Sequence, residues 1–455
     1  MIAPADVTAA FSPATWLSTW IWLFLLGSLL AGSCRKSGGS GEDDPLKTDI
    51  LKRTRDIYLW NDQIPGDFDP RRYAGPEEIM DAIRLYSKEP GFSEPVDHFS
   101  FAMKKTEWDN ISTGVATDFG MKVFFYTDDD LRVRMVEEDG PAGRAGIRRG
   151  WRIVAVNGDR NIIVDRGNFI MQTIYYSPSC TLRFQKPDGS EVEIPLVAAQ
   201  YQEDPLYLDT VYTLGAKRVG YLVLNSFLGD QPAIINELAV VFNHFIVSGV
   251  TDVVVDLRYN GGGYVSLQQR LANLLIPPAL NGSVMMGQEY NANHANENQL
   301  FFFEKLGTLD ISNVYFIVSD NTASASELLI NNLTPYMNVK LVGADTYGKP
   351  VGFYDVKVGE WLIFPVSFRS TNGLGKGDYF DGLKVDRVVP DGLDKDWGDR
   401  QESRLKAVLS YIESGSYGYA PPLPGLNSVL ESQVAQANKK LDRGSFKGAV
   451  AESPR

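Results

Sequence analysis

Apolar and polar residues follow three successive patterns along this chain, and the first is helical. Ile50 and Ile57 recur at helical spacing in one run, and Ile79 and Ile83 do so in the next. Apolar residues three, four or seven positions apart form one face of an amphipathic helix. The pattern predicts a small helical N-terminal region over residues 47–114.

The second pattern is the alternation typical of half-buried strands. Short alternating runs are separated by Gly, Pro, Asn and Asp, which terminate strands and form turns. The runs are Met121–Tyr126, Leu131–Met135, Arg152–Val156, Cys180–Phe184 and Val192–Leu196. A β-rich domain is therefore expected over residues 115–200.

The third pattern alternates continuous apolar strands with amphipathic helices over residues 205–412. The strands are Val219–Leu224, Val253–Leu257 and Tyr315–Ser319, and the helices are Ile234–Phe245 and Leu267–Ile276. Such alternation predicts an α/β core with a mostly parallel sheet covered by helices. Residues 413–455 are Gly/Pro/Ser-rich and then polar, which predicts a loosely packed C-terminal tail with one helix near 426–441. The fold class is α/β and multidomain.

The N-terminus carries an export signal. An apolar run covers Trp16–Gly32 and is followed two residues later by Cys34. A run of this kind that ends in small residues indicates a signal peptide over residues 1–33. A cysteine directly after small residues resembles the lipobox of bacterial lipoproteins, which implies that Cys34 is an acylated membrane anchor and that the Gly/Ser-rich residues 34–46 are a tether. The alternative is an uncleaved transmembrane helix, because the run is nearly long enough to span a bilayer.

Composition narrows the environment and the partners. The 455 residues carry a formal net charge of −13, whereas nucleic-acid binding requires clustered Lys and Arg to neutralise phosphates. We therefore expect no nucleic-acid partner. With Cys34 acylated, Cys180 is left without a second cysteine for a disulfide. The expected location is the cell envelope or periplasm, as an exported lipoprotein attached to the membrane.

Candidate chemistry lies between Ser319 and Gly352, where an apolar strand leads into a helix and then into a glycine turn that holds a lysine. Ser324 lies at the junction of strand and helix, where helix N–H groups stabilise developing negative charge. A serine nucleophile needs a base, and a lysine can serve when burial lowers its pKa toward neutrality. Lys349, 25 residues after Ser324, is the candidate base.

Three motifs resemble the C-terminal processing, or tail-specific, peptidase family. They are TASASE at 322–327, TYGK at 346–349 and DLRYNGGG at 256–263. The resemblance implies that Ser324 is the nucleophile and Lys349 its general base. It also implies an oxyanion hole formed by the backbone N–H groups of Gly262 and Ala325. The expected function is serine endopeptidase activity on exported or unfolded polypeptides, without a metal or cofactor.

The segment Gly140–Gly158 (GPAGRAGIRRGWRIVAVNG) resembles the signature of PDZ domains. Trp151 stands where PDZ domains of this group usually carry an acidic residue. The resemblance implies that the loop Phe119, Gly120 and Met121 holds the carboxylate of a substrate's C-terminal tail. The alternative is a PDZ fold that serves only as a regulatory spacer.

One position departs from the peptidase family. Members commonly carry Gln or a similar polar residue four positions after the lysine, where it orients the amine, and this chain carries Phe353. A backbone carbonyl or Glu327 is then left to orient Lys349. The alternative function is a catalytically inactive, peptide-binding lipoprotein of the same fold.

Other hydrolytic mechanisms find little support. The chain contains three histidines, His98, His244 and His294, and none stands in the sequence context of a Ser-His-Asp triad. No HExxH motif or Cys/His cluster indicates a metal site. The Ser324 and Lys349 pair is the favoured assignment.

The lipoprotein assignment makes a direct prediction. Full-length protein expressed with a labelled fatty acid should carry the label and sediment with membranes, whereas a Cys34→Ala form should do neither. Cys180→Ala is the matched control, because it removes the other cysteine of the chain. Equal labelling of the Cys34→Ala form would reject the anchor.

Overall fold

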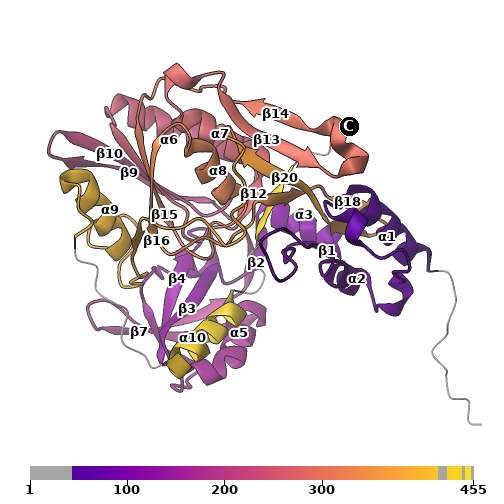
Figure 1. Cartoon of the computed structure of the whole chain (residues 1–455). Helices are drawn as coiled ribbons and strands as arrows, with labels where there is room; N and C mark the ends of the chain where they lie inside the picture. The colour runs from indigo at the N-terminus through magenta and orange to yellow at the C-terminus, as the bar shows by residue number, and fades with distance from the viewer. Residues whose placement is uncertain (1–43, 419–427, 443–445, 452–455) are drawn as a thin grey trace, which may run out of the picture. The chain divides into compact units, whose positions relative to one another are not determined.

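The structure is a computed structural model that describes residues 44–418, 428–442 and 446–451 (Figure 1). These residues all belong to one structural unit, Asp44–Arg455. The expected signal peptide and Cys34 lie outside the described residues. No helix in the described part of the chain combines the length and apolar character needed to cross a membrane.

The N-terminal helices form as their apolar spacing predicts. Helix α1 (Pro45–Ile57) begins at Asp44, whose carboxylate accepts hydrogen bonds from the first backbone N–H groups of the helix. Helix α2 (Pro76–Ile83) packs with it, and both bury their apolar faces in one cluster. That cluster also contains strands from two distant segments, which pair as β1 (Phe101–Lys104), β19 (Trp361–Phe364) and β18 (Val356–Val358). The N-terminal region is therefore built onto a later part of the chain.

The β-rich region contains every strand that the alternation predicts. They form one antiparallel sheet in the order β3 (Met121–Thr127), β4 (Asp130–Val136), β5 (Arg152–Val156), β6 (Ser179–Gln185) and β7 (Glu191–Val197). Helix α5 (Gly167–Tyr176) buries Ile170 and Ile174 against the apolar face of this sheet. Strand β3 lies at the edge of the sheet, so its outer N–H and C=O groups have no strand partner among the described residues.

A six-stranded sheet forms the centre of the core. In spatial order its strands are β21 (Arg387–Val388), β16 (Asn338–Gly343), β15 (Asn313–Val318), β11 (Asp252–Asp256), β10 (Lys217–Leu224) and β9 (Leu206–Leu214). All neighbouring pairs are parallel except β9 with β10. One face packs against α6 (Gln231–Val247), α7 (Val265–Leu275) and α8 (Ala325–Leu333), and the other against α9 (Ser403–Ser414). Because helices cover both faces of this sheet, its strands are continuous runs of apolar residues.

A second sheet was not predicted from the sequence. Its order is β12 (Gly262–Tyr264), β22 (Gly448–Val450), β17 (Val351–Phe353), β20 (Val366–Asn372), β13 (Val284–Tyr290) and β14 (Gln299–Phe302). Three of these strands have only three residues each, which is too short for a periodic signal. The sheet brings the glycine loop, the segment after Lys349 and the C-terminal tail together.

The described parts of the tail are packed against the rest of the chain, which differs from the expectation of a loosely packed tail. The helix expected near 426–441 is present as α10 (Ser428–Leu441), but Ala437 and Leu441 are buried in the cluster of the β-rich region. Strand β22 is buried between two strands of the second sheet. The polar composition of the tail conceals this packing. Only a few positions of α10, among them Ala437 and Leu441, are buried, and the surfaces that bury them come from other segments of the chain.

Candidate active site

Ser324 is held in an unusual backbone conformation at the start of α8. Its φ of 56° and ψ of −108° lie in a region that residues with a side chain rarely adopt. The side chain is buried, and its Oγ has no hydrogen-bond partner among the described residues. Ser326, by contrast, donates its hydroxyl to the carbonyl of Asn260 at 3.0 Å. Of the two serines, Ser324 is the one whose hydroxyl is not engaged by the fold.

Lys349 is buried on the other side of the site, directly after Gly348. Its Nζ donates a hydrogen bond to the backbone carbonyl of Lys447 at 3.1 Å. The same atom lies 3.3 Å from the ring centroid of Phe353 and 5.1 Å from that of Phe99. The residue in place of the family's usual polar side chain thus contacts the amine through an aromatic ring.

This environment favours the neutral amine. Burial holds the pKa of Lys349 well below its usual value of 10.5, against the opposing effect of the more distant carboxylates of Asp97 and Glu327. No carboxylate within the described residues forms an ion pair with the amine. A lysine in this state can accept a proton near neutral pH.

The carboxylate of Glu327 joins the two halves of the site. One oxygen accepts hydrogen bonds from the backbone N–H groups of Ser324 (2.8 Å) and Lys349 (2.9 Å). The other accepts from the backbone N–H of Gly348 at 2.7 Å and from the hydroxyl of Thr346 at 2.5 Å. Glu327 therefore positions the backbone of both candidate catalytic residues, while the carbonyl of Lys447 contacts the amine itself.

The two expected oxyanion donors are brought side by side. Gly262 has a φ of 108°, and a Cβ built on it would lie 3.1 Å from the backbone nitrogen of Ala325. Ala325 is the first residue of α8, so its N–H has no partner in the helical ladder. The N–H of Gly262 donates to the side-chain oxygen of Asn260 at 2.9 Å. Of the two expected donors, Ala325 is therefore the one whose N–H is left unpaired at the start of a helix, whereas the N–H of Gly262 is engaged by Asn260.

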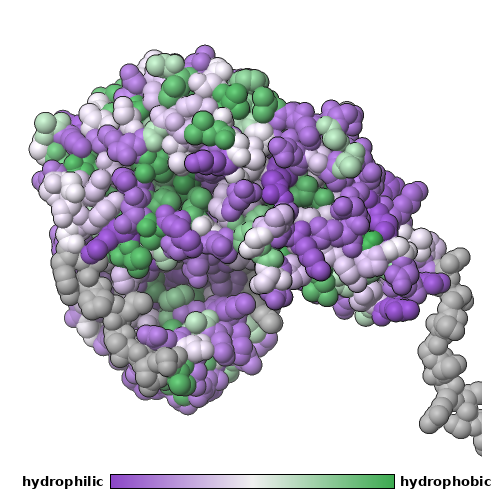
Figure 2. Space-filling model, viewed as in Figure 1, coloured by the Kyte–Doolittle hydropathy of each residue, from purple (hydrophilic) through white to green (hydrophobic). Residues whose placement is uncertain are grey.

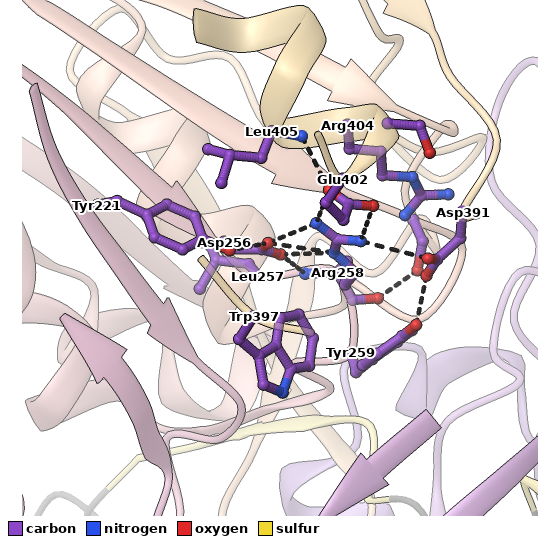
Figure 3. A network of polar contacts seen from close by, with 12 residues as sticks. Tyr221, Asp256, Leu257, Arg258, Tyr259, Asp391, Trp397, Glu402, Arg404 and Leu405 are labelled. Atoms are coloured by element: carbon purple, nitrogen blue, oxygen red, sulfur yellow. Dashed lines mark hydrogen bonds and ion pairs between the residues drawn. The ribbon is translucent and has the colours of Figure 1, made fainter. Parts of the chain in front are cut away.

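A buried arginine anchors the glycine loop (Figure 3). Arg258 follows β11 and forms paired hydrogen bonds with the carboxylates of Asp256 and Glu402. It also contacts Asp391, at 3.3 Å. Burial alone would lower the pKa of Arg258, but Asp256 and Glu402 raise it well above its usual value. Glu402 and Asp391 are not predicted from the sequence, because only the DLR motif marks this network and both carboxylates lie more than a hundred residues from Arg258.

The network extends into the β-rich region. Arg149 donates to the hydroxyl of Tyr259 at 3.0 Å and to Asp391 at 2.8 Å. Tyr259 in turn donates to Asp391. Arg149 lies within the segment Gly140–Gly158 and Tyr259 within the glycine loop, so one cluster connects the two motifs.

The expected peptide-binding loop lies beside an acidic pocket. The N–H of Gly120 donates to Asp118 at 2.6 Å, and the carbonyl of Phe119 accepts from Ala142 at 2.8 Å. A pocket of about 240 Å³ next to the loop is lined partly by Asp118, Gly120, Met121, Glu137 and Glu203. Burial raises the pKa of Glu137 to about 7. Figure 2 shows that this face of the molecule is hollowed between the β-rich region and the rest of the described chain.

The three histidines, which were considered as alternative catalytic bases, make their contacts elsewhere. His244 pairs with Asp209, and His294 contacts Glu297 and Asp56. His98 lines a separate pocket, and none of the three histidines contacts Ser324 within the described chain. Over those same residues, no group of three His, Cys, Asp or Glu side chains is placed to hold a metal ion.

A buried serine at a helix start, beside a glycine loop, is compatible with the nucleophile and oxyanion hole of a serine hydrolase. Residues 218–360 match the model of peptidase family S41, and residues 46–101 match that of the peptidase S41 N-terminal domain. These two matched segments make the chain similar to the peptidases of family S41.

Two sequence relatives and one solved structure that resemble this chain carry protease or peptidase names. A CtpA-like serine protease of Staphylococcus aureus is 25% identical over 368 residues, which cover 77% of this chain and 71% of the relative. The chloroplastic carboxyl-terminal-processing peptidase 1 of Arabidopsis thaliana is 25% identical over 317 residues, 66% of this chain and 62% of the relative. A crystal structure of an S41 protease from Bacteroides fragilis shares the fold, with a TM-score of 0.67, 22% identity and coverage of 81% of this chain and 97% of that chain. The two sequence relatives support a serine peptidase.

Glu327→Gln should weaken both stability and activity. An amide group cannot accept hydrogen bonds on both of its atoms, so at least one buried N–H of Ser324, Gly348 or Lys349 loses its acceptor. Each buried donor left unsatisfied costs about 1–3 kcal/mol. Denaturant unfolding should therefore show a loss of at least about 1 kcal/mol. Glu413→Gln, at an exposed carboxylate on α9, is the control, and equal stability of the two variants would contradict the bridging role.

Proposed function

We propose that this chain is a serine endopeptidase that uses Ser324 as nucleophile and Lys349 as general base. The observation that carries the proposal is the environment of Lys349. The amine is buried, its described contacts are one carbonyl and two aromatic rings, and its pKa is lowered. A structural buried lysine would be expected to pair with a carboxylate, as Arg258 does here.

The mechanism follows from this arrangement. Lys349 takes the hydroxyl proton as the Oγ of Ser324 attacks a peptide carbonyl carbon. The N–H of Ala325 and an N–H of the glycine loop at Gly262 stabilise the oxyanion. The protonated lysine then gives its proton to the leaving amine, and an acyl-enzyme remains on Ser324. Water, activated by the same lysine, hydrolyses that ester and restores the enzyme.

Two contacts must change before this chemistry can start. The Oγ of Ser324 and the Nζ of Lys349 are not hydrogen-bonded to each other, so the two groups must approach. The amine donates one N–H to the carbonyl of Lys447, which leaves its lone pair free to accept the serine proton. The N–H of Gly262 is engaged by Asn260. A substrate carbonyl that enters the site can compete for that N–H.

The β-rich region supplies substrate recognition in this proposal. We assign it as a PDZ domain that binds the C-terminal tails of polypeptide substrates. The loop Phe119–Met121 binds the carboxylate once Asp118 has released the N–H of Gly120. Support comes from the edge position of β3, because an extended peptide adds to such a domain as a further strand. The apolar cluster below β3 and α5 provides the floor for apolar side chains.

The place of action is also part of the proposal. An acylated Cys34 and its tether would hold the peptidase at a membrane of the cell envelope, where exported or unfolded polypeptides are available as substrates. This part rests on the N-terminal sequence. An inactive, peptide-binding lipoprotein is the alternative that the variants below separate.

Ser324→Ala and Lys349→Ala should each lower the rate of cleavage of an unfolded protein by about 10³-fold or more, as loss of a nucleophile or its base does. Ser326→Ala should keep a substantial part of the rate, because its hydroxyl serves only the carbonyl of Asn260. Gel assays of casein digestion measure all three. Normal cleavage by Ser324→Ala would refute the assignment, and no cleavage by any form would favour the inactive alternative.

The pH dependence tests the neutral lysine. Because the folded pKa of Lys349 is lowered, the unfolded chain binds the proton more readily between that pKa and 10.5. Stability should therefore fall as pH drops through this window, by up to about 1.4 kcal/mol per pH unit. Lys349→Met should lack this component, and cleavage by the wild type should decline as pH drops below the folded pKa. Parallel stability curves for the two proteins would contradict a neutral buried amine.

A further inference from the structure

The chain's own C-terminal segment fills the two places that a substrate needs. Helix α10 lies along β3 and α5 of the β-rich region, in yellow beside them in Figure 1. Strand β22, a few residues further on, lies between β12 and β17 at the catalytic loop. One segment thus covers both the proposed peptide-binding groove, which runs along the edge of β3 beside α5 (the β3 groove), and the candidate catalytic site.

Helix α10 occupies the free edge of β3 through a specific contact. The side chain of Asn438 accepts a hydrogen bond from the backbone N–H of Phe125 at 2.8 Å and donates to its carbonyl at 2.9 Å. These are the groups with which an added peptide strand would pair. Ala437 packs closely at Gly167 on α5, where an added Cβ would lie 3.7 Å from that of Ala437. A peptide cannot pair with Phe125 while α10 is in place.

Strand β22 occupies the catalytic site as a substrate backbone would. It pairs in parallel with β12, the N–H of Gly448 donates to the carbonyl of Gly261 at 2.9 Å, and a Cβ on Gly262 would lie 2.2 Å from the carbonyl oxygen of Gly448. On its other side, the N–H of Ala451 donates to the carbonyl of Phe353 at 3.1 Å. Ser324 is only 1% exposed beneath this arrangement.

The tail also contacts the proposed general base. The carbonyl of Lys447 accepts a hydrogen bond from the Nζ of Lys349, and the Oγ of Ser324 has no hydrogen-bond partner among the described residues. With the tail in place, the amine and the serine hydroxyl are therefore not joined by the hydrogen bond through which the base takes the serine proton. A bound tail that leaves this contact unmade is an inhibitor and not a substrate.

Further contacts hold the tail between these two places. Asp442 forms an ion pair with Arg134, whose side chain is buried. Phe446 packs against Trp108, with ring centroids 5.2 Å apart. The tail is therefore attached to the β-rich region, the N-terminal region and the catalytic loop.

We propose that residues 428–442 and 446–451 form an intramolecular inhibitor, which a polypeptide must displace from β3 and from the catalytic loop before it can be cut. The inhibition rests on the proposed peptidase function, whereas the occupation of the β3 groove does not. A substrate that takes the β3 edge removes α10, and loss of α10 weakens the hold on β22. Binding of a substrate at β3 would thereby also release the catalytic loop from inhibition.

The binding test uses the full chain in a Ser324→Ala background, so that no cleavage is needed. The probe is a fluorescent peptide with a free, apolar C-terminus, and its C-terminal amide is the control ligand. Ala437→Arg, which cannot pack at Gly167, and Asn438→Ala, which frees Phe125, should each lower the Kd by about tenfold. Gln433→Ala, at an exposed position on the same helix, should leave the Kd unchanged. An equal Kd for all of these forms overturns the proposal.

The activity test uses the same substitutions with Ser324 intact. Ala437→Arg and Asn438→Ala should cleave casein about tenfold faster than the wild type, and Gln433→Ala should match it. Unchanged rates with tighter peptide binding would overturn the inhibitor assignment and keep the groove assignment. Absence of activity in every form would refute the proposed function instead. Circular dichroism melting identifies a variant that has unfolded, in which case the milder Asn438→Ala decides.

Mass spectrometry of the purified chain separates inhibitor from substrate. The tail should stay intact in both the wild type and Ser324→Ala during prolonged incubation. Loss of the tail from the wild type alone would identify it as a substrate and overturn the inhibitor assignment.

Discussion

The carboxylate of Glu327 is the constraint on which the catalytic site depends. It accepts hydrogen bonds from the backbone of Ser324, Gly348 and Lys349 and from the hydroxyl of Thr346. The positive φ of Ser324 costs on the order of 1–3 kcal/mol, so the surrounding structure must compensate for it. A charge-assisted hydrogen bond to its N–H does so and simultaneously fixes the turn that carries the lysine. Ser324 and Lys349, the proposed nucleophile and base, are thus positioned by one side chain.

The site also depends on how its two buried cations differ. Arg258 is surrounded by Asp256, Asp391 and Glu402, which keep it charged and let it hold the glycine loop rigidly. Lys349 is also buried but has no ion pair with a carboxylate among the described residues. This burial lowers its pKa, against the support that the two rings and the carbonyl give to its charged form. The fold therefore keeps Arg258 charged for a structural role and leaves Lys349 with a lowered pKa, as the proposed proton transfer requires. Phe353 contributes to this difference by excluding water and charge from the amine.

Local signals were enough to predict much of this arrangement. Ser324 at a helix start, Lys349 after a glycine and the strands of the β-rich region all follow from spacing within a few residues. The second sheet and the pairing of Arg258 with Glu402 did not, because they join segments far apart in a chain whose short strands lack periodicity. The packing of the tail was missed for a related reason. Val434, Ala437 and Leu441 recur at helical spacing and give α10 an apolar face. The sequence does not show that this face and Asn438 meet β3 and α5, which lie in a distant part of the chain.

The position of the tail bears on how recognition and catalysis are coupled. A serine that is 1% exposed cannot meet a polypeptide until something moves, and β22 lies directly against the loop that must receive the substrate. Because α10 and β22 belong to one segment, a ligand that binds only the form with α10 displaced also favours the form with β22 displaced. Couplings of this kind typically amount to about 1–3 kcal/mol, or roughly 5- to 150-fold in affinity. The upper end of this range, roughly 150-fold, is enough to move the site from mostly closed to mostly open when a polypeptide binds at β3, without any change in the chemistry of Ser324 and Lys349.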